Sequence, residues 1–268
     1  MPECITRHPG TSADPVREHY DRHGFYFADL GPARDAFARY SQLGQLLQDA
    51  NATIEPIVDV GCGEGRAYLL MRHGQQSRYV GVDLSTGVLR RARDRTSALR
   101  LVQGDACALP VTDESAGLVI CQGVLHHTRD PRGAFAELAR IVVPGGLLQV
   151  SVYNRRALYY YLFVTLGPIC SCLAARSLGR ALLAVTLFPA VYALVFQPAH
   201  CAYGVYRPMP VRGAWKFFLD QYAHPRVWFF RRHEICDWAE DEGLEIVRFE
   251  RELAGWMLSY VLRKRITT

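Results

Sequence analysis

The chain has 268 residues, of which 50% are hydrophobic and 21% charged, and its net charge is +5. This composition is typical of a globular protein and excludes a disordered chain. The eight cysteines form no CxxC pair, and no signal peptide opens the chain. We therefore expect a cytoplasmic protein with reduced thiols and no metal site.

Two helices are expected before the first strand. Asp14 is a suitable N-cap, and Pro15 suits the first turn of the helix that follows it. A second helical stretch covers roughly residues 35–50. These segments predict an N-terminal helical cap, which we place at residues 1–52.

From residue 57 onward, strands and helices alternate, and Ser85 and Asp130 are candidate helix caps. Apolar strands that alternate with helices indicate a parallel α/β sheet covered on both faces. Two later strands, "LEIVRFERE" and "GWMLSYVLRK", are separated by too few residues for a helix, so they should pair antiparallel. The earlier strands lie in "PIVDVG", "RYVGVDLS", "LRLVQGDA", "AGLVICQGVLHH" and "GGLLQVSVYN".

Gly61, Gly63 and Gly65 follow the first of these strands, in "IVDVGCGEGRAYLL". Glycine adopts backbone angles closed to other residues and lets a ligand approach the backbone. The helix that follows offers free N–H groups and the positive end of its dipole. The spacing is G-x-G-x-G and not the G-x-G-x-x-G of dinucleotide-binding proteins, which disfavours a nicotinamide oxidoreductase.

Acidic residues stand at the ends of the next two strands. A carboxylate at the position of Asp83 can accept hydrogen bonds from both ribose hydroxyls of a nucleoside. Asp105, in "QGDA", can accept from an adenine amino group. The glycine loop and the two acids therefore predict a nucleoside lying across the carboxyl ends of the strands.

Five motifs resemble, in order and spacing, those of class I S-adenosylmethionine-dependent methyltransferases, with the ubiquinone and menaquinone C-methyltransferases nearest. They are "VDVGCGEG", "VGVDLS", "QGDACALP", "VICQGVLHHTRDP" and "VPGG", and the resemblance covers residues 57–154. It implies a Rossmann-like, mostly parallel seven-stranded sheet whose last strand is antiparallel, with helices on both faces. It also implies a transferase with S-adenosylmethionine as cofactor and S-adenosylhomocysteine as product.

The resemblance also implies which residues surround the cofactor. The glycine loop would hold the methionine part, Asp83 the ribose and Asp105 the adenine edge. The full predicted set is Tyr20, Asp59, Gly61, Cys62, Gly63, Gly65, Asp83, Leu84, Asp105, Ala106 and Gln122. For Asp59 a structural role in ordering the loop is an equal alternative, and Cys62 is interpreted as a small residue that fits and not as a nucleophile.

The candidate catalytic residues are His126, His127, Tyr222 and His224. The sulfonium methyl is electrophilic without help, so a general base is needed only if the acceptor must lose a proton. His126 and His127 lie just past the fourth strand, where a histidine can serve as that base near neutral pH. The alternative is a structural role, because an "HH" pair is common at this position among relatives with unrelated substrates.

The segment between the fifth strand and the tail is apolar and basic: residues 138–219 contain eight cations and no Asp or Glu. Our leading interpretation is an inserted hydrophobic basic lid over the active site, at residues 155–219. The alternatives are a face that rests on a membrane through residues 155–206 and, least favoured, a membrane-spanning hairpin. Tyr26, Arg155 and Arg226 are the candidate substrate-binding residues.

Residues 53–154 then form the cofactor-binding core, and residues 220–268 complete its sheet. We expect a methyltransferase for a small hydrophobic acceptor, such as an aromatic, polyketide or isoprenoid natural product. An acceptor that also carries a negative charge is an open alternative. One alternative is a methyltransferase of lipids or quinones at the inner face of the membrane. Another is an inactive protein that binds the cofactor and acts through interactions. Nucleic acid is disfavoured, because the basic residues are interleaved with apolar ones.

Overall fold

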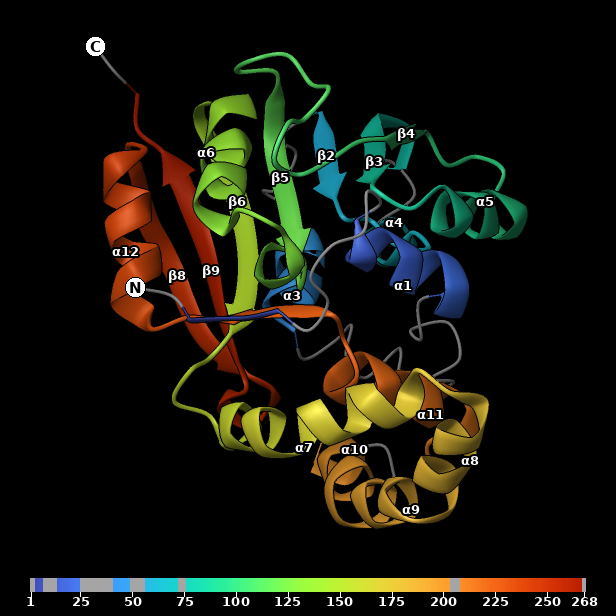
Figure 1. Ribbon diagram of the computed structural model, residues 1–268. Helices are drawn as coiled ribbons and strands as arrows, with labels where there is room; N and C mark the ends of the chain where they lie inside the picture. The colour runs from blue at the N-terminus through green and yellow to red at the C-terminus, as the bar shows by residue number, and fades with distance from the viewer. Residues whose placement is uncertain are drawn as a thin grey trace.

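The computed structural model describes residues 3–6, 14–24, 41–48, 56–71, 76–202 and 208–266 (Figure 1). Its main feature is a seven-stranded sheet with the order β4-β3-β2-β5-β6-β9-β8. The last strand, β9, runs antiparallel to both of its neighbours, β6 and β8, as predicted. The strands are β2 (Ile57–Val60), β3 (Tyr79–Asp83), β4 (Leu101–Gln103), β5 (Ala116–Gln122), β6 (Val142–Tyr153), β8 (Leu244–Glu252) and β9 (Met257–Lys264).

The parallel strands end at one edge of the sheet, which brings the predicted loops together. Asp59 of β2 lies beside Gly81 of β3, and Asp83 at the end of β3 lies beside Gln103 at the end of β4. The loops that follow these strands therefore leave the sheet side by side. Residues that are 20 or more positions apart in the sequence become neighbours in this way.

Helices cover both faces of the sheet, as the alternation predicted. One face carries α3 (Gln42–Gln48), α4 (Arg66–Leu70) and α5 (Thr86–Arg95), and the other carries α6 (Pro131–Ile141) and α12 (Arg232–Asp241). Each layer packs apolar side chains on the sheet, and this burial is the main stabilising contribution. The predicted caps are confirmed: Asp14, Ser85 and Asp130 each accept a hydrogen bond from a first-turn N–H of α1 (Pro15–His23), α5 and α6.

The structure adds a second, two-stranded sheet that the sequence did not predict. β1 (Glu3–Thr6) pairs antiparallel with β7 (Arg226–Phe229). Of the helix expected over residues 35–50, the described part is α3, and the remaining positions lie outside the described residues. Short helical turns complete the path: η2 (Gln76–Arg78), η3 (Leu125–His127) and η5 (Leu253–Gly255).

The segment after β6 is helical, as expected for an insertion. It comprises α7 (Leu158–Ala174), α8 (Ser177–Val185), α9 (Leu187–Val191), a π-helical turn (Tyr192–Phe196), α10 (Gln197–Ala202) and α11 (Val211–Tyr222). These helices lie beyond the carboxyl ends of the parallel strands (Figure 1). They enclose an apolar core of their own, the helical core, built on Cys170, Leu183, Phe188, Val191, Phe196, Met209, Ala214, Phe218, Leu219 and Tyr222.

Among the described helices, none is by itself both long and apolar enough to cross a bilayer. By length and composition, α8 joined to residues 187–196 would pass as one span bent by 42°.

Candidate active site

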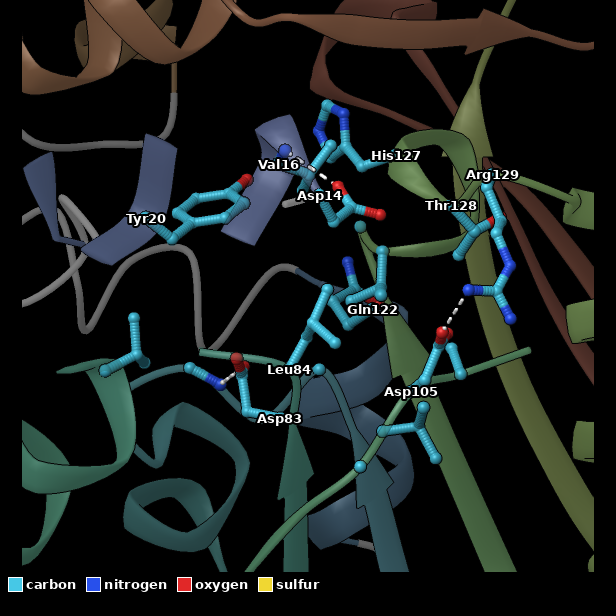
Figure 2. A pocket seen from close by; sticks show the side chains of 18 residues that line it. Asp14, Val16, Tyr20, Asp83, Leu84, Asp105, Gln122, His127, Thr128 and Arg129 are labelled. Carbon is cyan, nitrogen blue, oxygen red and sulfur yellow. Dashed lines mark hydrogen bonds and ion pairs between the residues drawn. The ribbon is translucent and has the colours of Figure 1, made fainter. Parts of the chain in front are cut away.

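A pocket opens at the carboxyl ends of β2, β3, β4 and β5, and Figure 2 shows the side chains that surround it. It lies where the sequence predicted a nucleoside. The predicted residues that line it are Tyr20, Gly61, Gly63, Asp83, Leu84, Asp105, Ala106, Gln122 and His127. The lining residues that the sequence reasoning did not assign to a site include Asp14, Val16, Thr128 and Arg129.

Gly61 forms the floor of the pocket next to β5. Its φ is +71°, and a Cβ placed there would come within 2.2 Å of a methyl group of Val124. Both the backbone angle and the available space therefore require glycine at this position. A side chain here would displace Val124, which also lines the pocket.

Asp83 organises the glycine loop as well as lining the pocket. One carboxylate oxygen accepts the N–H of Gly63 at 2.9 Å, and the other accepts the N–H of Ser85 at 2.9 Å. Burial raises the pKa of Asp83, while these two hydrogen bonds oppose that rise. Each oxygen of an ionised carboxylate has a further lone pair, so Asp83 can also accept from a pair of ligand hydroxyls.

Asp105 lies at the neighbouring strand end and forms an ion pair with Arg129. The Asp105 Oδ2 to Arg129 Nη1 distance is 2.9 Å, and Oδ1 accepts the N–H of Cys107 at 2.9 Å (Figure 2). The Arg129 side chain is 57% exposed, so the pair contributes only about 0–1 kcal/mol. A ligand can therefore displace Arg129 from this carboxylate at small cost.

Asp59 of β2 and the loop residues Cys62 and Gly65 do not line the pocket. Asp59 is buried and accepts a hydrogen bond from the Tyr79 hydroxyl at 2.7 Å. Burial, together with the nearby Asp83 carboxylate, raises the pKa of Asp59 to about 7. Cys62 is buried against Gly81, and burial raises the pKa of its thiol, so the thiolate needed for nucleophilic attack is disfavoured.

Gln122 lies at the end of β5, in the centre of the pocket. Its side-chain oxygen accepts a hydrogen bond at 2.7 Å from the amide nitrogen of Gln149 on β6. This contact directs the Gln122 amide group along one side of the pocket. Gln149 is fully buried and lies on the next strand, 27 positions further along the chain, so no local pattern indicated its supporting role.

His127 lines the pocket, whereas His126 does not. The Nδ1 atom of His127 lies 2.9 Å from the backbone oxygen of Arg226, and a carbonyl oxygen can only accept, so Nδ1 carries the proton. The lone pair of the neutral ring is then on Nε2. Burial lowers the pKa of His127 to about 4, so at neutral pH the ring is uncharged and able to accept a proton, though as a weak base.

A family model described as a methyltransferase domain matches residues 58–150. An uncharacterized methyltransferase of Mycobacterium tuberculosis is 34% identical over 127 residues, which are 46% of this chain and 64% of that protein. A demethylmenaquinone methyltransferase of Renibacterium salmoninarum is 29% identical over 136 residues, which are 48% of this chain and 57% of that protein. Residues 58–150 are therefore a methyltransferase domain of the class I S-adenosylmethionine-dependent type. The chain spans less than two thirds of the length of the curated relatives it matches.

Two solved structures of methyltransferases share the fold of this chain. Magnesium protoporphyrin IX methyltransferase from Synechocystis, with bound S-adenosylhomocysteine, superposes with a TM-score of 0.58 at 14% identity, over 93% of this chain and 98% of that one. The Burkholderia thailandensis 1,6-didemethyltoxoflavin-N1-methyltransferase gives a TM-score of 0.55 at 14% identity, over 99% of this chain and 96% of that one.

The residues of the pocket fit S-adenosylmethionine, the cofactor of this family. The glycine backbone at Gly61 and Gly63 and the carboxylates at two adjacent strand ends match a nucleoside with a polar tail. Asp83 would accept from the ribose, Asp105 would face the adenine edge, and the glycine loop would lie along the methionine part. When bound, the cofactor supplies a methyl group on a sulfonium, which needs no further activation.

Helix α1 forms a wall of the pocket and places Tyr20 opposite His127, with ring centroids 6.5 Å apart (Figure 2). The helix is held by α5. Arg91 donates to the backbone oxygen of Tyr20 at 2.9 Å, and Asp21 accepts from the Gly87 N–H at 3.0 Å and from the Ser85 hydroxyl. The first turn of α5 therefore fixes the helix that closes the pocket.

The other predicted site residues lie outside the pocket lining. His126 stacks on Tyr153 with ring centroids 3.8 Å apart, and Tyr222 is buried in the helical core. Arg155 lies over the Tyr160 ring at 5.8 Å, and the Arg226 side chain forms an ion pair with Asp14 at 3.4 Å. Tyr26 lies outside the described residues. His224 is fully buried, and its ring centroid is 3.7 Å from that of His127.

Proposed function

We propose that the protein transfers a methyl group from S-adenosylmethionine to a small hydrophobic acceptor. The observation that carries the proposal is the convergence of the Gly61 loop, Asp83, Asp105 and His127 on one pocket. His127 is the candidate base, because its neutral ring keeps a lone pair on Nε2.

Support for a hydrophobic acceptor comes from the helical segment beyond the strand ends. Behind the pocket residue His127 lies the ring of Tyr153, with centroids 5.9 Å apart, and Tyr159 and Phe229 pack on Tyr153. Residues 155–219 would then serve as the lid over the acceptor. An acceptor of this kind is an aromatic, polyketide or isoprenoid compound of specialised metabolism.

Turnover with a panel of phenolic, polyketide and isoprenoid acceptors tests the proposal, with S-adenosylhomocysteine release as the readout. We expect release with at least one lipophilic acceptor, and its abolition or strong reduction in His127→Gln if a proton must be removed. Calorimetric titration with S-adenosylhomocysteine, run in parallel, reports cofactor binding alone. Tight binding without turnover on any acceptor would favour the inactive interaction protein instead.

A second candidate function, methylation of a lipid or quinone at a membrane, is favoured by the surface of the helical segment. Leu178, Val185 and Leu194 are 82%, 74% and 76% exposed, and exposed Arg176 lies beside Leu178. Residues 138–219 contain no acid that would repel a membrane surface. Apolar side chains next to cations suit an anionic lipid surface.

Sedimentation with phosphatidylglycerol vesicles distinguishes the two candidates, with phosphatidylcholine vesicles as the uncharged comparison. The membrane function predicts binding to the anionic vesicles that falls in the Leu178→Asn, Leu194→Asn double variant. Ile266→Asn, which changes an exposed apolar residue outside the helical segment, should leave vesicle binding unchanged. Absence of vesicle binding by the unaltered protein would leave the first candidate alone.

A further inference from the structure

Three metal-ligating side chains from distant parts of the chain meet next to the cofactor pocket. They are His19 on α1, Asp220 in the last turn of α11 and His224 in the turn before β7, and one ligand atom from each lies within 4.8 Å of the other two. The side chains of His19 and Asp220 are 10% and 8% exposed, and His224 is fully buried. None of the three lines the cofactor pocket.

His224 presents an unused lone pair in this cluster. Its Nδ1 lies 2.8 Å from the backbone oxygen of Arg226 and 3.3 Å from the Arg226 nitrogen. The shorter contact, to an oxygen that can only accept, favours the tautomer with the proton on Nδ1 and the lone pair on Nε2. Within the described residues, Nε2 is buried and has no hydrogen-bond partner. A buried acceptor without a donor is unfavourable, so a hydrogen-bond donor or a cation at Nε2 would stabilise this arrangement.

The other two groups face each other without a direct hydrogen bond between them. His19 Nε2 and Asp220 Oδ1 are 4.0 Å apart, which is too far for a hydrogen bond. Around a first-row metal ion with bonds of about 2.0–2.2 Å, ligand atoms are separated by roughly 3–4 Å. Small side-chain movements would therefore bring all three atoms to bonding distance.

The surroundings hold the ligands in the orientation that a metal needs. Ligating histidines usually donate their second ring N–H to a carbonyl or carboxylate, as His224 does to Arg226. The Asp220 carboxylate accepts from the Tyr20 hydroxyl at 3.2 Å and from the Gln221 amide at 3.2 Å. Two imidazoles and one carboxylate are the donor set of mononuclear iron(II) and zinc sites with open positions.

We propose that His19, Asp220 and His224 bind one divalent first-row transition-metal ion, with zinc and iron(II) as the best-matched ions. The site goes beyond the proposed methyl transfer and does not depend on it. It is separated from the cofactor pocket by Tyr20 and by His127, whose ring centroid is 3.7 Å from that of His224. An open coordination position would take an oxygen ligand. The sequence had indicated no metal site. His19 and Asp220 are 201 residues apart and Asp220 and His224 are 4 apart, which matches no known metal-binding spacing.

Metal binding itself is the test, so no acceptor is required. The purified full chain is stripped with a chelator and titrated with Zn²⁺ by calorimetry, and with Co²⁺ by visible absorption, which reports the ligand set. We expect one ion per chain and a Co²⁺ spectrum of a nitrogen and oxygen site. His224→Gln and Asp220→Asn should each weaken binding on the order of 100-fold. His233→Gln, at an exposed histidine of α12, is the matched control and should leave the affinity unchanged.

Several results would overturn the assignment. One is the absence of Zn²⁺ and Co²⁺ binding by the unaltered chain, which would mean that water or a shared proton fills the cluster. Another is binding that survives both ligand variants, or that falls equally in His233→Gln. Circular dichroism checks that each variant is folded, and Asp220→Asn, which preserves shape, remains informative if His224→Gln does not fold. Because binding is measured without turnover, failure of the metal site and failure of methyl transfer are distinguishable.

Discussion

Asp59 and Asp83 are both acids at the carboxyl edge of the sheet, yet their surroundings give them different properties. Asp83 lines the pocket and accepts two backbone N–H groups, which favour its ionised form. Asp59 precedes the loop and accepts a hydrogen bond from the Tyr79 hydroxyl, but burial has the larger effect and raises its pKa. At residue scale, therefore, Asp83 is suited to a ligand and Asp59 to holding the loop.

Asp83→Asn tests the ribose assignment. The variant keeps one acceptor oxygen but loses the charge and the second acceptor, so S-adenosylhomocysteine binding should weaken by about 1–3 kcal/mol, roughly tenfold or more in Kd. Isothermal titration calorimetry measures the change. Asp94→Asn, at an exposed position of α5, is the control and should bind normally. An unchanged Kd in Asp83→Asn would remove Asp83 from the cofactor site.

Asp59→Asn tests the buried acid through its pH dependence. The folded protein keeps the proton on Asp59 up to a pKa of about 7, while the unfolded chain releases it near the ordinary value of 3.8. The folded state thus binds more protons between these values, and the stability contributed by Asp59 falls as pH rises through this window. The Asn variant lacks this loss. Its free energy of unfolding relative to the parent should therefore rise by up to about 4 kcal/mol between pH 4 and pH 8.

Urea unfolding of parent and variant across this pH range checks the prediction. Asp94→Asn should keep a constant difference from the parent. A constant difference for Asp59→Asn as well would mean that Asp59 is ionised throughout.

At element scale, the position of α1 decides whether the pocket has a wall on that side. The helix is amphipathic and capped by Asp14, but its placement depends on Asp21 and on the Tyr20 backbone oxygen, which bind the first turns of α5. α5 in turn holds the glycine loop, because Arg91 and Arg95 pair with the buried Glu64. One helix therefore links the loop to the wall of the pocket.

Asp21→Ala should loosen α1. Loss of the bonds to Gly87 and Ser85 should speed amide exchange of residues 14–24 by about fivefold, which corresponds to about 1 kcal/mol. Hydrogen exchange with mass spectrometry measures the change. Arg22→Ala, at an exposed position of the same helix, is the control. Equal exchange in Asp21→Ala and the parent would show that other contacts hold α1.

At the scale of the whole molecule, the helical segment is joined to the sheet by an aromatic cluster. Tyr153 of β6, Tyr159 and Phe163 of α7 and Phe229 of β7 pack together. Tyr159 also donates to the backbone oxygen of Gln221 at 2.7 Å, which connects the two ends of the segment. The segment and the sheet should consequently unfold as one unit.

Tyr159→Phe removes this buried hydrogen bond and leaves the Gln221 oxygen without it. We expect a loss of about 1–2 kcal/mol in the free energy of unfolding, with a single transition retained. Tyr161→Phe, whose side chain is 60% exposed, should change stability little. Two separate transitions in the parent protein would contradict the coupling of segment and sheet.

The sequence alone determined the sheet, its antiparallel last strand, the caps at Asp14, Ser85 and Asp130 and the glycine loop. These depend on period, turn chemistry and motifs within a few residues of one another. The meeting of His19 with Asp220 and His224, the pairing of β1 with β7 and the hydrogen bond from Gln149 to Gln122 were decided only by the tertiary structure. Contacts between residues 27 to 226 positions apart depend on how the layers pack, and no local pattern encodes that packing.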